Sequence, residues 1–174
     1  MEANSLHRLM NDAAAAVAHD VSSHRHAGAA TEAWPAESEV VALCASLAGA
    51  SSSQRARFRA ELGHRQRVVL GRFGARSVAV ALRESSPARL RVGLIAIALE
   101  DTNADPRDLM VTVAPHHHVA RQLGLAPAEI FDEAASFANP DTAAVLRAFG
   151  RRTDVTPEAF GFRPFDTPVD PRIA

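Results

Sequence analysis

The segment Leu90–Glu100, LRVGLIAIALE, decides the fold because it is apolar on nearly every side of a helix. Ser86 and Pro87 stand before it, a residue that can cap a helix followed by proline in the first turn. A helix that is apolar all round is buried by its neighbours. We therefore expect a helix from Pro87 to about Glu100 at the centre of the hydrophobic core.

Similar signals recur on both sides of this segment, with a cap or proline at the start, an apolar stripe, and often a glycine at the end. They predict further helices at about 35–49, 51–62, 63–84, 105–124, 127–137 and 139–149. Pro115 lies inside one of them and should kink it. We therefore predict an all-α protein, a compact bundle or a short solenoid-like stack of about six to eight helices.

The chain is expected to divide into three parts. Residues 1–37 lack a sustained apolar stripe. They should form a helix near residues 5–19, followed by a flexible polar loop. Residues 38–150 carry the helical core. Residues 151–174 contain four prolines and the phenylalanines Phe160, Phe162 and Phe165. This irregular C-terminal arm should pack back on the core, because exposed phenylalanines at this density are unfavourable.

Composition narrows the class and location of the protein. The apolar fraction is 47%, aromatic residues are 5%, and tyrosine is absent, which favours helices over sheets. All 19 basic residues are arginine, which indicates a GC-rich, bacterial coding sequence. Cys44 is the single cysteine, so no internal disulfide is possible, and no window approaches the roughly 20 apolar residues of a membrane span. We expect a cytoplasmic protein without a membrane partner.

Charge is distributed unevenly along the chain. Residues 1–50 have a net charge of −4, residues 51–99 have +8, and residues 100–174 have −5. The basic region holds the candidate binding residues Arg55, Arg59, Arg65, Arg72 and Arg76. The last three can share one helix face, where guanidinium groups suit a partner's carboxylates. Pairing with the acidic regions of the same chain is the alternative.

Three consecutive histidines, His116, His117 and His118, form the second candidate site. Imidazole binds zinc, copper, iron and nickel, so a metal could involve His116 and His117 with Asp101. Consecutive helical residues point about 100° apart, however, whereas two helical ligands to one ion need a spacing of three or four. We therefore predict no metal or other cofactor. An enzyme with a site around the triplet and Glu100, Asp101 or Asp105 is kept as an alternative.

The sequence contains no nucleophile elbow, phosphate-binding glycine loop, dinucleotide fingerprint or zinc-finger spacing. Cys44 lies among apolar residues, where a thiol is usually inert. We therefore interpret the chain as a non-enzymatic helical module that binds another protein or a second copy of itself. Nucleic-acid binding by the arginine-rich helices is a further alternative, which the absence of interleaved aromatic residues disfavours.

Overall fold

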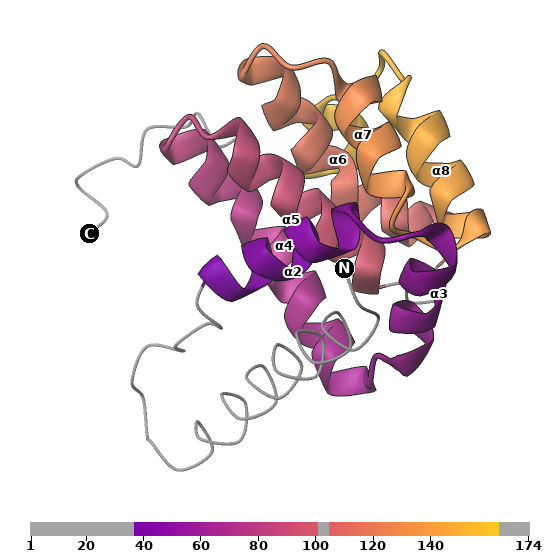
Figure 1. Ribbon diagram of the computed structural model, residues 1–174. Coiled ribbons are helices and arrows are strands. Elements are labelled where there is room, and N and C mark those ends of the chain that lie inside the picture. Colours follow the sequence, from indigo (N-terminus) through magenta and orange to yellow (C-terminus); the bar gives the residue numbers. More distant parts are fainter. Residues whose placement is uncertain (1–36, 101–104, 164–174) are drawn as a thin grey trace, which may run out of the picture.

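The computed structural model describes residues 37–100 and 105–163, which fold into helices joined by short turns (Figure 1). The helices in these ranges are α2 (Glu37–Ala48), α3 (Ser52–Glu61), α4 (His64–Arg83), α5 (Pro87–Glu100), α6 (Pro106–Gln122), α7 (Pro127–Ala135), α8 (Pro140–Gly150) and α9 (Pro157–Phe160). Neither range contains a strand, which confirms the all-α prediction. The helix expected at residues 5–19 lies outside the described residues.

Polar caps set where the helices begin, as the sequence predicts. The Ser51 hydroxyl accepts a hydrogen bond from the Gln54 amide at 3.2 Å, and the Gln54 side chain accepts one from the Ser51 amide at 2.8 Å. At the start of α8, Asn139 Oδ1 accepts from the Thr142 amide at 2.9 Å. These amides have no partner within their own helix, so each cap satisfies a group that would otherwise remain unbonded.

Helix α5 lies at the centre of the core and contacts α2, α4, α6 and α7 (Figure 1). All residues from Gly93 to Leu99 are buried, so every side of this part of the helix is covered. Leu94 is 0% exposed and Ile97 is 3% exposed. The central position predicted from LRVGLIAIALE is therefore confirmed.

Helices α4 and α5 form a hairpin that packs closely because small residues face each other across it. A Cβ atom added at Gly74 would lie 2.5 Å from the Gly93 carbonyl oxygen and 2.5 Å from Ile97 Cγ1. A Cβ atom added at Gly93 would lie 2.5 Å from Ser77 Cβ. The turn between the helices passes through Ser85, whose φ of 48° lies in the left-handed region. The backbones thus approach to a distance that only glycine permits.

Helices α7 and α8 form a second close hairpin, and α6 contacts both hairpins. Phe131 and Phe149 fill the interior of this half, with ring centroids 5.7 Å apart. A Cβ atom added at Gly150 would lie 2.6 Å from Phe131 Cβ, so α8 also approaches its partner through a glycine.

The described part of the C-terminal arm, residues 151–163, lies against the helices. Val155 is fully buried, and Phe160 and Phe162 are partly buried against the core. A short helix, α9, occupies the middle of this segment. Phe165 and the remainder of the predicted arm lie outside the described residues.

Candidate functional site

Three of the predicted binding residues, Arg65, Arg72 and Arg76, are exposed on one side of α4. At 100° per residue their positions fall within an arc of about 40°, and they span about 16 Å along the helix. We call these three residues the arginine face. The opposite side of α4 is buried, because Phe73, Gly74 and other apolar or small residues pack there against α5. The packing of the hairpin therefore turns the arginine face toward solvent.

Two small residues of α4, Ala75 and Ala79, are also exposed beside this line of arginines. Arg83, which is not among the predicted binding residues, falls on the same line, since it follows Arg76 by seven residues. Arg83 lies 3.6 Å from Glu84 in an exposed ion pair. The seven-residue spacing was the signal that could have identified it.

Within the described residues, no carboxylate forms an ion pair with Arg65 or Arg72. The carboxyl group of Glu100 lies beside α4, where it occupies the space next to Gly71. It is half-buried, and burial raises its pKa, because its charged form loses contact with water. Arg65 and Arg72 thus have no ion-pair partner among the carboxylates of the described residues.

Arg55 has a different position from the arginine face, because its guanidinium binds the chain itself. Its Nε donates to the Leu47 carbonyl at 2.7 Å, and Nη2 donates to the Ala48 carbonyl at 2.8 Å. Its Nη1 donates to the carbonyl of Ser136 at 3.1 Å and to the Ser136 hydroxyl at 3.0 Å. The guanidinium also lies 4.5 Å from the ring centroid of Phe137. Arg55 therefore joins the ends of α2 and α7.

Arg59 and Arg67 also bind backbone carbonyls at helix ends. Arg59 Nη1 donates to the Phe137 carbonyl at 2.8 Å. Arg67 donates to the carbonyl of Leu62 at 3.2 Å and to that of Glu100 at 2.9 Å. The last carbonyls of a helix lack partners within it and carry partial negative charge, which cations stabilise. The predicted set thus divides: Arg55 and Arg59 hold the fold, whereas the arginine face is exposed.

The three histidines of the triplet point toward different parts of the molecule. His116 is fully buried, and its Nε2 lies 2.9 Å from the carbonyl oxygen of Gly74 on α4. Burial lowers the pKa of His116 to about 4, although the carbonyls of Gly74 and Thr112 partly oppose this shift. The imidazole is therefore neutral near pH 7, with Nε2 protonated so that it donates to Gly74.

His117 is equally buried but faces α7 and α8. Its ring centroid lies 5.8 Å from that of Phe131 and 5.6 Å from that of Phe149, both in edge-to-face geometry. Neither ring nitrogen has a hydrogen-bond partner in the described structure. Burial lowers the pKa of His117, and the carbonyls of Arg152 and Gly150 partly oppose this. The sequence placed His117 only beside the apolar stripe, because the stripe on α6 does not reveal what α7 and α8 contribute.

His118 is partly buried, and its ring contacts Phe162 edge-to-face at 5.5 Å. Among the described residues, no group of three His, Cys, Asp or Glu side chains is placed to hold a metal ion. Asp105 caps α6 by accepting a hydrogen bond from the Arg107 amide at 2.8 Å, and Asp101 lies outside the described ranges. Among the described residues, no carboxylate of the alternative enzyme site forms an ion pair or hydrogen bond with the histidine triplet.

Cys44 is buried, and burial raises the pKa of its thiol to about 12. The thiol is therefore protonated at neutral pH, and a protonated thiol is a poor nucleophile and metal ligand. This agrees with the inert residue that the sequence predicts.

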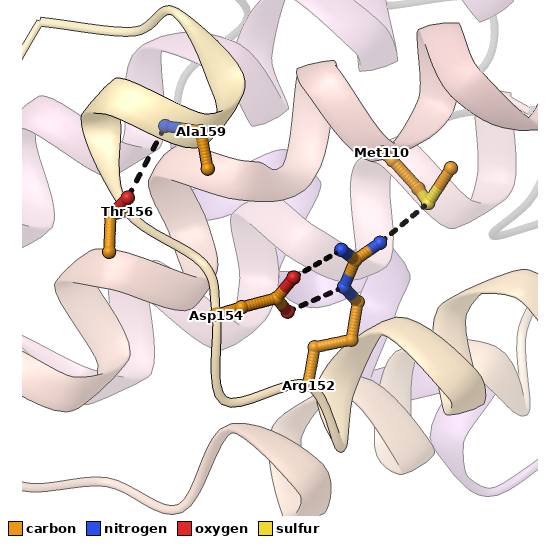
Figure 2. Close-up of polar contacts among 5 residues, drawn as sticks. All are labelled: Met110, Arg152, Asp154, Thr156 and Ala159. Carbon is orange, nitrogen blue, oxygen red and sulfur yellow. Dashed lines mark hydrogen bonds and ion pairs between the residues drawn. The ribbon is translucent and has the colours of Figure 1, made fainter.

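Arg152 and Asp154, which are not among the predicted site residues, form a paired contact at the start of the C-terminal segment (Figure 2). The guanidinium donates to both carboxylate oxygens, at 2.8 and 2.6 Å, and lies 3.8 Å from Met110 Sδ on α6. It also lies 5.1 Å from the ring centroid of Phe160. The two-residue spacing of opposite charges was the only signal in the sequence. Asp154 has a pKa lowered to about 2, chiefly by its hydrogen bond from Arg152.

Comparison with protein-family models, curated proteins and solved structures gave no match. In the two described ranges, no helix combines the length and apolarity required to cross a membrane. The functional interpretation therefore depends on the residues themselves.

Proposed function

We propose that this chain is a non-enzymatic helical module that binds an acidic surface of another protein through the arginine face of α4. The observation that carries the proposal is the separation of arginine roles. Arg55 and Arg59 bind backbone carbonyls of the same chain, whereas Arg65, Arg72 and Arg76 are exposed on a helix whose other side is buried, and Arg65 and Arg72 form no ion pair with the described residues. We place this interaction in the cytoplasm of a bacterium, as the composition predicts.

The chemistry of the face suits carboxylates. Guanidinium is planar and always charged, and it donates two parallel hydrogen bonds to a carboxylate. An exposed ion pair contributes about 0–1 kcal/mol in water, whereas a pair that loses water at an interface shows coupling energies of about 1.5 kcal/mol or more. Exposed Ala75 and Ala79 would allow a partner surface to approach the α4 backbone. Loss of three such pairs should weaken binding at least 100-fold, which is about 3 kcal/mol.

The test compares the wild type with two charge-matched variants. The face variant combines Arg65→Glu, Arg72→Glu and Arg76→Glu. The control variant combines Arg107→Glu, Arg147→Glu and Arg163→Glu, which are exposed and lie outside α4. Both variants have the same net charge, so a difference between them reports position rather than total charge.

Proteins retained by the wild type and the control, but not by the face variant, are identified, purified and titrated against all three by calorimetry. We expect an acidic protein whose affinity falls at least 100-fold for the face variant and less than about threefold for the control. If no purified protein distinguishes the two variants, the proposal is wrong.

Two further measurements test the other possible roles of this face. Binding to a random DNA duplex tests a nucleic-acid role, and sedimentation analysis tests self-association. Duplex binding that falls steeply with salt, and that only the face variant loses, would assign the face to nucleic acid. Self-association that only the face variant loses would assign it to a contact between two copies of the chain. Either result would replace the acidic partner protein.

A further inference from the structure

A second stripe of residues runs beside the arginine face on the outer surface of α4. Each arginine of the face is followed three positions later by an apolar residue: Val68 after Arg65, Ala75 after Arg72, and Ala79 after Arg76. Three positions turn the helix by about 300°, so the second stripe lies about 60° to one side of the first. Val68 is partly exposed, and Ala75 and Ala79 are exposed. We call Val68, Ala75 and Ala79 the apolar stripe.

Helices α5 and α6 pack on the side of α4 that faces away from both stripes. Helix α5 approaches α4 at Gly74 and Ser77, which lie against Gly93, and His116 of α6 contacts the Gly74 carbonyl oxygen. At 100° per residue, Gly74 and Ser77 lie about 180° and 120° around the helix from Arg65. Helix α4 contains no proline, so the outer surface continues without a kink. The two stripes thus form one straight surface about 20 Å long.

The edge of the apolar stripe opposite the arginines carries a carboxyl group. Gly71 follows Val68 by three residues, so it lies a further 60° or so around the helix, away from Arg65. The carboxyl group of Glu100 occupies the space beside Gly71. The apolar stripe therefore lies between a basic edge and an edge with a single acidic group. This arrangement favours a partner whose own carboxylates lie along one edge only, because like charges repel.

We propose that the partner contributes an acidic amphipathic helix that lies along α4, with apolar residues on the apolar stripe and carboxylates on the arginine face. The inference rests on the proposed function and adds the form of the partner. Arg65 and Arg72 have no ion-pair partner among the described residues, so they complement such carboxylates. In paired helices an apolar seam supplies the contact, and the charges beside the seam determine which helix is accepted.

The spacing along α4 distinguishes a helical partner from an extended one. Arg65 and Arg72 are about 10.5 Å apart along the axis, and Arg72 and Arg76 are about 6 Å apart. A second helix repeats both separations with residues seven and four positions apart. Side chains on one face of an extended segment recur about every 6.6 Å, which matches only the shorter separation.

The apolar stripe also distinguishes this partner from a nucleic acid. A nucleic-acid backbone carries a charge at every phosphate and has no apolar edge that would cover Val68, Ala75 and Ala79. An amphipathic helix has an apolar and a charged edge side by side, as α4 does. Its backbone could approach α4 closely, because Ala75 and Ala79 have no side-chain atom beyond Cβ.

The test titrates the isotope-labelled full chain with three synthetic peptides of identical composition and about 21 residues, long enough to form a helix. Two matched peptides carry leucines at positions i, i+7 and i+11, with glutamates along one edge or along the other, so that parallel and antiparallel packing are both covered. The control peptide carries its glutamates on the side opposite the leucines. NMR shifts of the α4 amides measure binding. We expect one matched peptide to bind at least tenfold more tightly than the control peptide.

Two variants of the chain show whether a bound helix contacts the apolar stripe. The stripe variant combines Ala75→Gln and Ala79→Gln. Its control combines Ala56→Gln and Ala60→Gln, which are exposed on α3 with the same spacing. Glutamine is a good helix former and leaves the net charge unchanged, so both variants should fold. We expect the stripe variant to bind the matched peptide at least tenfold more weakly than its control does, and equal binding would overturn the inference.

The outcomes separate this inference from the proposed function. If all three peptides bind equally and the face variant loses all of them, the arginines bind acidic groups without requiring a helix. The inference is then wrong and the proposed function stands. If the face variant binds the matched peptide as tightly as the wild type does, both are wrong. If no peptide binds, the inference is wrong, and the titration of the purified acidic protein decides the proposed function independently.

Discussion

The Nε2 atom of His116 lies 2.9 Å from the carbonyl oxygen of Gly74, and this contact joins α6 to α4. On its other side, Gly74 contacts Gly93 and Ile97 of α5 through the space that a Cβ atom would fill. Three helices therefore meet at a residue without a side chain. The arginine face is on the opposite side of α4, so this junction determines how the face is presented to solvent.

Gly74→Ala should destabilise the protein by about 1–3 kcal/mol, the usual cost of inserting an atom into a packed core. The new Cβ would lie 2.5 Å from the Gly93 carbonyl, so α4 and α5 would have to separate. Gly49→Ala is the matched control, because the nearest atom to its added Cβ is 3.8 Å away. Urea unfolding measures both, and equal effects of the two substitutions would show that the close approach does not matter.

Stability should fall with acid because of His116. Its pKa is about 4 when folded and about 6.5 when unfolded, so the unfolded state binds more protons between these values. The free energy of unfolding is therefore highest above pH 6.5 and decreases by about 2 kcal/mol from this residue between pH 7 and pH 5. Urea unfolding of wild type and His116→Gln checks this, since the variant should have the shallower pH dependence. Parallel curves would contradict the assignment.

Truncation in α5 should be costly, because this helix is covered on every side. Leu94→Ala or Ile97→Ala should each reduce the free energy of unfolding by about 2–5 kcal/mol, the usual range for large buried aliphatic residues. Val111→Ala serves as a control, since Val111 is 52% exposed. A loss well below 1 kcal/mol at both α5 positions would mean that α5 is not the centre of the core.

Substitution of Arg55 and substitution of the arginine face should have different effects on thermal unfolding. Arg55→Ala removes hydrogen bonds to Leu47, Ala48 and Ser136, so we expect a loss of about 2–3 kcal/mol and a clearly lower melting temperature. All three residues of the face variant are exposed, and Arg65 and Arg72 form no hydrogen bond or ion pair with the described residues, so its melting temperature should change by only about 1–3 °C. A larger decrease for the face variant than for Arg55→Ala would show that the face is an internal clasp.

The sequence predicts helix positions well because their signals are local. Ser51, Asn139 and the prolines at helix starts act within one helical turn, so the element bounds follow from short stretches. The central position of α5 also follows from its own apolar surface.

Contacts between distant residues could not be predicted in this way. The guanidinium of Arg55 binds Ser136, which is 81 residues away, and nothing near Arg55 distinguishes it from Arg65. His117 is buried by Phe131 and Phe149, which belong to other helices. Local periodicity shows which side of a helix is apolar, but the partners on that side depend on the assembled fold.

The ratio of dissociation constants between the face variant and the charge-matched control, for the purified acidic partner, tests the central claim most directly. The measurement is made at two salt concentrations, because Coulombic attraction between exposed charges weakens with salt. We predict a ratio of at least 100 at low salt and a smaller ratio at high salt. A ratio near one at both concentrations would contradict the assignment of Arg65, Arg72 and Arg76 to a binding surface.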